Sequence, residues 1–281
     1  FLYFPLTAPH TPIVPTDEFR GMSGCGEYGD YMCEVDWCVG QVMAALERKG
    51  IAENTLLLFA SDNGPENPAY GHIQEYGHYS MAHLRGIKRD AWEGGHRMPF
   101  IVRWPKGKPS QVRRELVSTL DLFPTFLEIS EAEPVADLPG RSLLPLLRGE
   151  KPKWRKYMPT EYHLHSAHNY YPQRAIRNDR YKLIENLQPG EEDPGYEFTV
   201  QRFFGQQVLA VLPKASKTVQ DAYALMKRPP RYQLYDLQAD PYEFVNLAED
   251  PAHRSALDEL STELTRWRKA TRDPLLNPEN V

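Results

Sequence analysis

The sequence has no excess of positive charge and no long apolar run. Its 33 lysines and arginines are outnumbered by 38 acidic residues, giving a net charge of −5, so its charge does not favour a nucleic-acid partner. No apolar stretch approaches the ~20 residues that a membrane-spanning helix needs. Internal repeats and low-complexity tracts are also absent. These features predict a soluble globular chain that is long enough to bury a large core.

Cysteine is scarce, and its pattern excludes one common kind of site. The three cysteines, Cys25, Cys33 and Cys38, are odd in number and lack the C-x-x-C spacing of a structural zinc site. Helical phase places Cys33 and Cys38 on nearby parts of one predicted helix, so we expect buried free thiols. Cysteine usage therefore leaves the redox compartment open.

The start of the sequence has neither a methionine nor a signal peptide. It opens on Phe1-Leu2-Tyr3-Phe4, which is apolar and predicts a buried strand over residues 1–6. We expect this start to correspond to the middle of a domain, as in a truncated chain or a cleaved precursor.

Proline and glycine are plentiful, at 25 and 18 residues, which is typical of an α/β or α+β protein with long surface loops. Apolar residues recur at helical period over 28–49, and Gly50 stands where a left-handed C-cap belongs. Residues 55–60 form a continuous apolar strand. Strand, helix and strand together predict a βαβ unit and hence an α/β fold with a mostly parallel mixed sheet flanked by helices.

The pattern changes after a proline- and lysine-rich stretch at 149–156, which predicts a domain boundary. We expect residues 1–150 to be the C-terminal part of an α/β domain and residues 151–281 to be a smaller α+β subdomain with an antiparallel sheet. The remaining predicted elements are a strand at 99–104, a helix at 121–129, a short helical or irregular apolar segment at 143–147, a β-hairpin at 174–184, a strand at 232–237 and a helix at 253–268.

Polar residues directly follow the apolar strand at 55–60. In open α/β sheets, ligands bind beyond the carboxyl ends of strands. Asp62 offers a carboxylate and Asn63 a carbonyl oxygen, both hard ligands suited to Ca²⁺ or Mg²⁺, and Gly64 lets the backbone turn so that the two side chains converge. The same residues also fit a simple Asx turn without a metal.

Two further residues are candidates for the same site. His10 lies between prolines in the loop after residues 1–6, where it could contact an oxyanion or donate a proton, or be an ordinary surface histidine. Lys88 could neutralise an anionic substrate, and Gly94 and Gly95 permit close backbone approach. The alternative for the Lys88 stretch is a solvated charged loop.

Taken together and in this order, these segments resemble the type I, formylglycine-dependent sulfatases of the alkaline-phosphatase superfamily. The match is arylsulfatase-like, and the C-terminal region resembles that of heparan N-sulfatases. The residues that carry the resemblance are Ala8-Pro9-His10-Thr11-Pro12, Ser61-Asp62-Asn63-Gly64, Leu84-Arg85-Gly86-Ile87-Lys88 with Trp92-Glu93-Gly94-Gly95, Gly140-Arg141-Ser142-Leu143, and Leu234-Tyr235-Asp236-Leu237.

The resemblance implies roles for the candidate residues. Asp62 and Asn63 would bind one divalent cation, Ca²⁺ in preference to Mg²⁺, and Asp62 would also help in catalysis. Lys88 and His10 would bind the sulfate group and act in catalysis. The family's nucleophile arises from the Cys or Ser of a C/S-x-P-x-R motif. None of the three cysteines of this sequence begins such a motif. We therefore expect formylglycine in a segment outside this sequence and the chain alone to be inactive.

The resemblance implies a sulfuric ester hydrolase acting on a sulfated carbohydrate or aryl sulfate, exported to periplasm, lysosome or cell exterior. The segment 161–168 could line a sugar pocket, with His163 and His165 binding substrate, or be an exposed loop. A glycosaminoglycan N-sulfatase, a phosphoryl-transfer enzyme of the same superfamily and a non-catalytic sulfated-glycan-binding module are the alternatives. The sequence leaves the particular substrate and the oligomeric state open.

Overall fold

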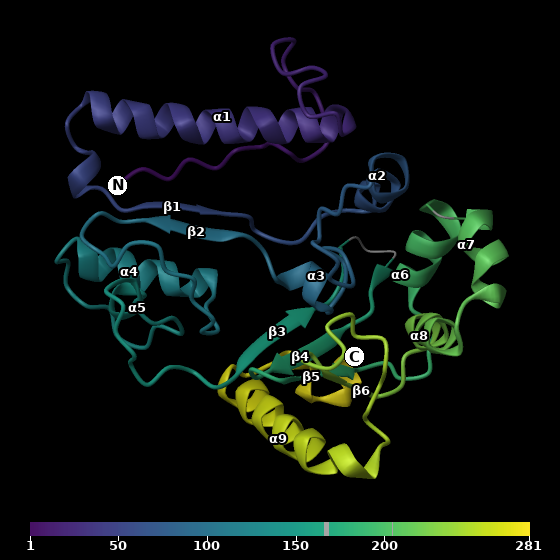
Figure 1. Ribbon diagram of the computed structural model, residues 1–281. Helices are drawn as coiled ribbons and strands as arrows, with labels where there is room; N and C mark the ends of the chain where they lie inside the picture. Colours follow the sequence, from purple (N-terminus) through teal and green to yellow (C-terminus); the bar gives the residue numbers. More distant parts are fainter. Residues whose placement is uncertain (166–168, 204) are drawn as a thin grey trace.

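The computed structural model describes residues 1–165, 169–203 and 205–281. Its main parts are a long helix near the N-terminus, two small sheets and a group of helices in the connection between strands β5 (Tyr181–Asn186) and β6 (Tyr232–Asp236) (Figure 1). Helix α1 spans Gly26–Arg48, as predicted, and contains Cys33 and Cys38. Gly50 follows it with a left-handed φ of +67°, which confirms the predicted helix end. All three cysteines are free thiols, as expected, but they are half-buried rather than buried.

The N-terminal prediction was wrong. Residues 1–6 form no strand, and the side chains of Phe1 and Leu2 are 98% and 74% exposed. Strand β1 (Leu57–Ala60) instead pairs antiparallel with β2 (Phe100–Arg103). A parallel sheet needs neighbouring strands that run in the same direction, and residues 1–6 do not supply such a strand. The predicted mostly parallel sheet is therefore not formed by the described residues. In the ranges described, both sheets are antiparallel.

The second sheet has four antiparallel strands in the order β3-β4-β5-β6, which agrees with the predicted antiparallel sheet. The predicted hairpin is confirmed by the antiparallel pairing of β4 with β5. The side chain of Asn178 closes the turn by accepting hydrogen bonds from the N–H groups of Arg180 and Tyr181. The strands are β3 (Met158–Tyr162), β4 (Gln173–Arg177), β5 (Tyr181–Asn186) and β6 (Tyr232–Asp236).

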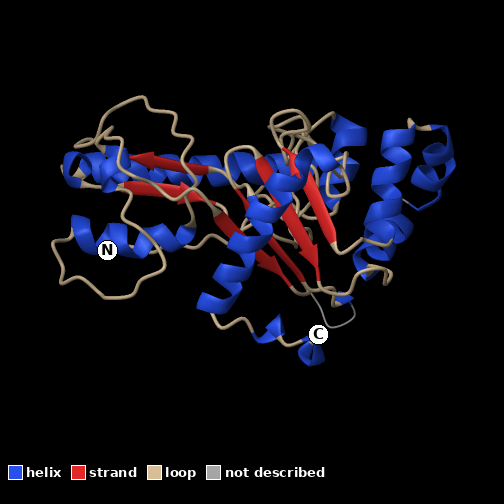
Figure 2. Ribbon diagram, turned by 90° about the horizontal axis from the view of Figure 1, so that it is seen from below, coloured by secondary structure: helices blue, strands red, loops and turns tan. Residues whose placement is uncertain are grey.

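This sheet is covered on both faces, and the coverage positions the candidate site. Helix α9 (Arg254–Ala270) crosses one face of the sheet, as Figure 2 shows from below. Its residues Leu257, Leu260 and Leu264 pack against that face. On the other face, Ala91 and Trp92 pack against Ala175, Ile184 and Tyr235. Short helix α3 (Glu93–His96) follows directly, so the segment that carries Lys88 rests on the sheet.

The other helices lie around these sheets. None of the helices among the described residues is long and apolar enough to cross a bilayer. The α-helices are α2 (Pro68–Tyr76), α4 (Leu122–Ile129), α5 (Leu144–Leu147), α6 (Pro194–Tyr196), α7 (Gly205–Val211) and α8 (Lys217–Lys227), and a π-helix spans Glu197–Phe203. Short 3-10 turns span Ala52–Asn54, Thr119–Asp121, Leu212–Lys214, Pro251–His253, Pro274–Leu276 and Pro278–Asn280.

Candidate anion-binding site

The loop that follows β1 contains the predicted metal ligands. Asp62 is exposed, and its Oδ1 accepts the N–H of Asn63 at 3.0 Å. The side-chain amide of Asn63 donates to the Gly64 carbonyl at 2.8 Å, so its oxygen is the end directed away from that bond. Gly64 is buried against Gly94: a Cβ there would lie 1.9 Å from the Gly94 carbonyl oxygen. Only glycine fits this position. The close contact holds the backbone next to Asp62 and Asn63, the two predicted metal ligands.

The Lys88 segment is fastened to this same loop. The N–H of Lys88 donates to the Pro65 carbonyl at 2.9 Å, and the N–H of Gly64 donates to the Gly95 carbonyl at 3.0 Å. Two backbone hydrogen bonds therefore hold the two predicted parts of the site side by side.

Glu66 brings two cations together at this junction. Its carboxylate lies 3.1 Å from the Lys88 ammonium and accepts two hydrogen bonds from Nε of Arg89, at 2.8 and 2.9 Å. Burial acts to raise the pKa of Glu66, but hydrogen bonds from Arg89, the Asn67 N–H and Lys88 outweigh it and hold the pKa below its ordinary value. With Glu66 ionised, the two cations exceed the one carboxylate by a single positive charge.

One predicted histidine, His165, lies near this group of charges, whereas the exposed His10 contacts the Thr11 carbonyl through its Nδ1 at 2.8 Å. Partial burial lowers the pKa of His165, and the nearby positive charges of Arg89 and Lys88 lower it further. His10 adds to this lowering, while Glu66 acts in the opposite direction. The structure therefore places Lys88, Arg89 and His10 each within electrostatic range of His165.

His163 is directed elsewhere. Its Nε2 lies 3.8 Å from the carboxylate of Glu161, a residue that also lies 3.6 Å from Arg174. Glu161 and His163 are two positions apart on extended backbone and share a side. In the stretches that the structure describes, no hydrogen bond or ion pair joins His163 to Lys88. Residues 166–168 of the predicted sugar-binding segment lie outside the described residues.

The Lys88 segment is also anchored to the sheet through buried charges. The Arg85 guanidinium donates to the Glu243 backbone carbonyl and lies 3.9 Å above the Trp92 ring. Glu93, 4% exposed, pairs with Lys182 of β5 at 3.2 Å. Its backbone N–H donates to the Glu243 carboxylate at 2.7 Å. Such contacts fix the backbone on either side of Lys88.

The oxygen ligands suit a hard cation in kind but supply only part of a coordination sphere. Ca²⁺ takes 6–8 oxygen ligands, of which Asp62 and Asn63 offer two or three. Among the described residues, no group of three or more histidine, cysteine or acidic side chains could hold an ion. A cation bound here would therefore draw its other ligands from water, substrate or other residues.

Two members of this site, Glu66 and Arg89, were missed from the sequence. Arg89 adjoins Lys88 in a run of charges, and Glu66 stands in the turn-like stretch Gly-Pro-Glu-Asn. Nothing in either local pattern marks one as the partner of the other, since the pair is separated by 23 positions. The only available signal was the proximity of Glu66 to the predicted ligand Asp62.

Comparisons with known proteins show which proteins this chain is similar to. Residues 1–132 match the family model described as Sulfatase, and residues 83–199 match N-sulphoglucosamine sulphohydrolase, C-terminal. Steryl-sulfatase of Rattus norvegicus is 42% identical over 149 residues, which cover 50% of this chain and 25% of that protein. N-acetylgalactosamine-6-O-sulfatase of Bacteroides thetaiotaomicron is 32% identical over 270 residues, which cover 93% of this chain and 45% of that protein.

Solved structures give the same result. A structure from work on glycosaminoglycan metabolism by Bacteroides thetaiotaomicron matches with a TM-score of 0.67 and 30% identity, covering 93% of this chain and 48% of that one. A phosphonate monoester hydrolase from Silicibacter pomeroyi matches with a TM-score of 0.59 at 24% identity, a likeness of fold alone. The chain spans less than half the length of each of these relatives.

Proposed function

The chain belongs to the sulfatase family, and we propose that it provides the anion- and metal-binding part of a site that hydrolyses sulfate esters of a carbohydrate or aryl alcohol. The observation that carries the proposal is the pairing of Lys88 and Arg89 around the single carboxylate of Glu66. A surplus of one positive charge matches a sulfate monoester, which carries one negative charge. A preorganised cation of this kind stabilises charge that develops on sulfate oxygens.

The proposal gives each residue one task. Lys88 binds the non-bridging sulfate oxygens, and His10 contacts the sulfate and protonates the leaving oxygen. Asp62 and Asn63 hold the cation, which we take to be Ca²⁺ rather than Mg²⁺, and Asp62 also accepts a proton from the nucleophile. When bound, the cation would polarise a sulfate oxygen. The nucleophile, formylglycine in this family, would come from residues outside this sequence.

The same proposal assigns substrate recognition to residues 151–281. His165 is a proposed recognition residue, and the positive charge of Lys88 acts on it to lower its pKa. His163 remains a proposed substrate ligand; its Nε2 lies 3.8 Å from the Glu161 carboxylate and has no hydrogen-bond partner among the described residues. A sulfated carbohydrate is the favoured substrate class because a curated relative matching 93% of this chain is named N-acetylgalactosamine-6-O-sulfatase.

A sulfamidase is the second candidate, and the match of residues 83–199 to the N-sulphoglucosamine sulphohydrolase C-terminal model favours it. The two candidates differ in the bond that is cleaved, S–O or S–N. The gene product that carries these residues together with a C/S-x-P-x-R segment would be assayed on an O-sulfated sugar and on N-sulfoglucosamine. Release of sulfate from the second substrate alone would replace the ester proposal.

The anion-binding part of the proposal can be tested on the 281-residue chain itself. Calorimetric titration with inorganic sulfate and with an aryl sulfate, in the presence of Ca²⁺, should show binding that weakens about 10-fold or more in Lys88→Ala, since a charge-assisted hydrogen bond contributes about 1.5–3 kcal/mol. Lys106→Ala is the control, because that lysine bonds Asn54 at an exposed position. Equal affinity in wild type and Lys88→Ala would overturn the proposal.

A further inference from the structure

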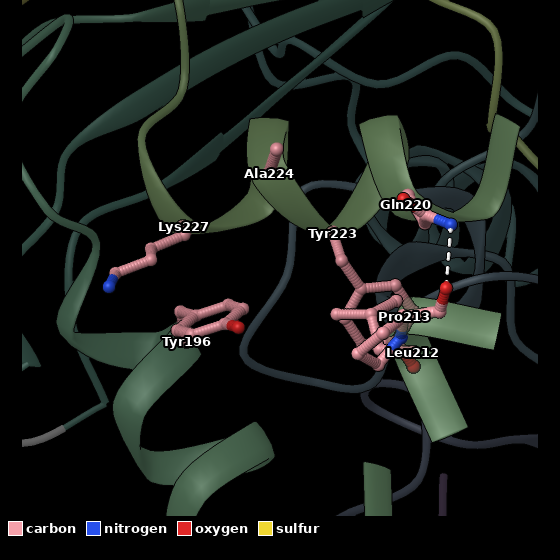
Figure 3. Close-up of a pocket in the computed structure, with 7 residues that line it drawn as sticks. All are labelled: Tyr196, Leu212, Pro213, Gln220, Tyr223, Ala224 and Lys227. Atoms are coloured by element: carbon pink, nitrogen blue, oxygen red, sulfur yellow. Dashed lines mark hydrogen bonds between the residues drawn. The ribbon is translucent and has the colours of Figure 1, made fainter. Parts of the chain in front are cut away.

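A pocket lies between the elements that connect β5 to β6. Its volume is about 330 Å³, and Figure 3 shows it beneath α8, bounded by α6 and the turn Leu212–Lys214. This size lies at the small end of the ~300–1,000 Å³ that ligand pockets span, which suits one ring rather than an extended molecule. The lining residues are Tyr196, Leu212, Pro213, Gln220, Tyr223, Ala224 and Lys227.

The lining combines aromatic faces with a polar edge. The rings of Tyr196 and Tyr223 bound the pocket, and the Lys227 ammonium lies 5.9 Å from the Tyr196 ring centre. Lys227 is itself paired with Glu192 at 3.0 Å. The amide nitrogen of Gln220 donates to the Pro213 and Ala215 carbonyls, at 3.3 and 2.9 Å, which orients its amide group. The pocket thus offers flat apolar surfaces together with the ammonium group of Lys227 and the amide group of Gln220.

A pyranose ring has the complementary surface. Its C–H faces are apolar and pack on tyrosine rings, and its hydroxyl groups hydrogen-bond with ammonium and amide groups such as those of Lys227 and Gln220. A wholly apolar ligand, such as a sterol, would pack on the tyrosine rings but would offer no hydrogen-bond partner to Lys227 or Gln220 at the pocket edge. The lining therefore favours a sugar over an apolar ring system.

Both walls of the pocket are tied to the segment that carries the sulfate-binding cations. Arg85 donates to the carbonyl of Ala222, the residue before Tyr223 in α8, at 3.2 Å. Arg89 lies 4.5 Å above the ring of Phe198, two residues after Tyr196. The pocket and the anion site are thus held to one backbone segment, so their separation is fixed.

We propose that the Tyr196–Tyr223 pocket is a subsite that binds a sugar ring of a glycan whose sulfated unit occupies the Lys88 site. This inference rests on the proposed function for its second half only, because the pocket can bind a sugar whether or not sulfate is hydrolysed. The subsite would let the protein prefer a sulfate within a chain over the same sulfate on a monosaccharide.

The test uses an unsulfated chondroitin tetrasaccharide as the probe, with binding measured by calorimetry and by saturation-transfer NMR. We expect Tyr223→Ala to weaken binding about 10-fold and Lys227→Gln to weaken it by a smaller factor. Lys217→Gln is the matched control, since that lysine lies on the same helix, 81% exposed, and pairs with Asp221. Inorganic sulfate should bind all three variants as it binds wild type.

Three outcomes would overturn the subsite. They are no tetrasaccharide binding to wild type at millimolar concentration, unchanged binding in both Tyr223→Ala and Lys227→Gln, and equal loss in Lys217→Gln. Displacement of the tetrasaccharide by a sterol at lower concentration would show that the occupant is apolar, which also contradicts the proposal. Tetrasaccharide binding without any sulfate binding would instead defeat the proposed function and leave the subsite standing.

Discussion

The Lys88 ammonium lies 3.1 Å from the Glu66 carboxylate, so Glu66 occupies the position of an anion beside the proposed sulfate-binding cation. Arg89 shares the same carboxylate at 2.8 Å. Substrate sulfate must therefore compete with a carboxylate that belongs to the protein. The pair both holds Lys88 in place and limits how strongly it attracts a ligand.

Replacing Glu66 by glutamine should separate these two effects. The change removes the competing charge and keeps the shape, so we expect sulfate affinity to rise by roughly 5-fold, the equivalent of about 1 kcal/mol for a partly exposed ion pair. Calorimetry at low salt measures the sulfate affinity of both proteins. Glu259→Gln is the control, because Glu259 pairs with Lys156, a lysine that is 63% exposed. Weaker sulfate binding in Glu66→Gln would show that positioning of Lys88 outweighs charge.

Gly64 should tolerate no side chain. A Cβ at this position would lie 1.9 Å from the Gly94 carbonyl, so Gly64→Ala must separate the β1 loop from the Lys88 segment. We expect a stability loss of about 3 kcal/mol or more, together with weaker sulfate binding. In Gly71→Ala, within α2, a Cβ meets nothing within 4 Å. That variant should be more stable by about 0.5–1 kcal/mol. Urea denaturation compares them, and equal stabilities would contradict the account.

Asp193 should make stability fall as pH rises. Burial and the charge of Asp90 raise the pKa of Asp193 to about 7. The unfolded carboxyl titrates near ~3.9. Because the folded state holds the proton more tightly, stability is full below about pH 4 and is lost progressively up to about pH 7. Asp193→Asn keeps the oxygen that caps Gly195, at 2.7 Å in wild type, and removes this titration.

We therefore expect Asp193→Asn to reduce the decline in the free energy of unfolding between pH 5 and pH 8 by on the order of 2 kcal/mol. Urea denaturation across this pH range measures the change. Asp250→Asn is the matched control, since Asp250 also precedes a proline and caps a helix, through the Ala252 N–H. Hydrogen bonding to Ala252 and His253 lowers the pKa of Asp250, so its effect should appear on the acid side instead. A slope that is the same in Asp193→Asn and wild type would refute the assignment.

A buried ion-pair network fastens the C-terminal residues to the sheet. Asp273 accepts hydrogen bonds from Arg174 at 2.8 and 2.9 Å and from Arg268 at 2.7 Å. Burial acts to raise the pKa of Asp273, but the two arginines outweigh it and hold the pKa far below its usual range. Asp273→Asn should cost about 3 kcal/mol at neutral pH, because Arg174 and Arg268 both lose a carboxylate partner, although Arg268 keeps Glu185 at 2.9 Å.

The pH dependence of this contribution has the opposite sign to that of Asp193. The stability from Asp273 is fully present above the unfolded pKa of ~3.9 and is lost as pH falls toward the folded pKa. The difference between wild type and Asp273→Asn should therefore shrink below about pH 4. Asp258→Asn, at an exposed pair with Arg254, should change stability by less than about 0.5 kcal/mol at any pH.

Local patterns predicted the elements whose stabilising contacts are local. Helix α1 and its end at Gly50, and the hairpin closed by Asn178, depend on residues within one or two turns of each other. Residues 1–6 failed because a strand requires a partner, and apolar composition does not specify one. Strand β1 was found, but its antiparallel partner β2 lies some 40 positions further along the chain, beyond the reach of periodicity.

The site divides in the same way. The positions of His10, Asp62, Asn63, Lys88 and His165 followed from residue type and family resemblance, and their roles remain predictions. Glu66 and Arg89 escaped notice because their importance comes from a contact between distant segments. The pocket beneath α8 was also unforeseen, since its walls are formed by helices whose sequences show no unusual pattern. The sequence thus suggested which residues could act at the site, whereas tertiary packing determines which side chains surround them.

The segment from Leu84 to His96 is attached to the β1 loop by Lys88, to α8 by Arg85 and to the sheet by Glu93. An insertion or deletion inside it would pull at least one of these attachments out of register. Attempts to redirect selectivity by changing loop length should therefore leave this segment intact and alter the connection between β5 and β6, where recognition can diverge without moving the cations.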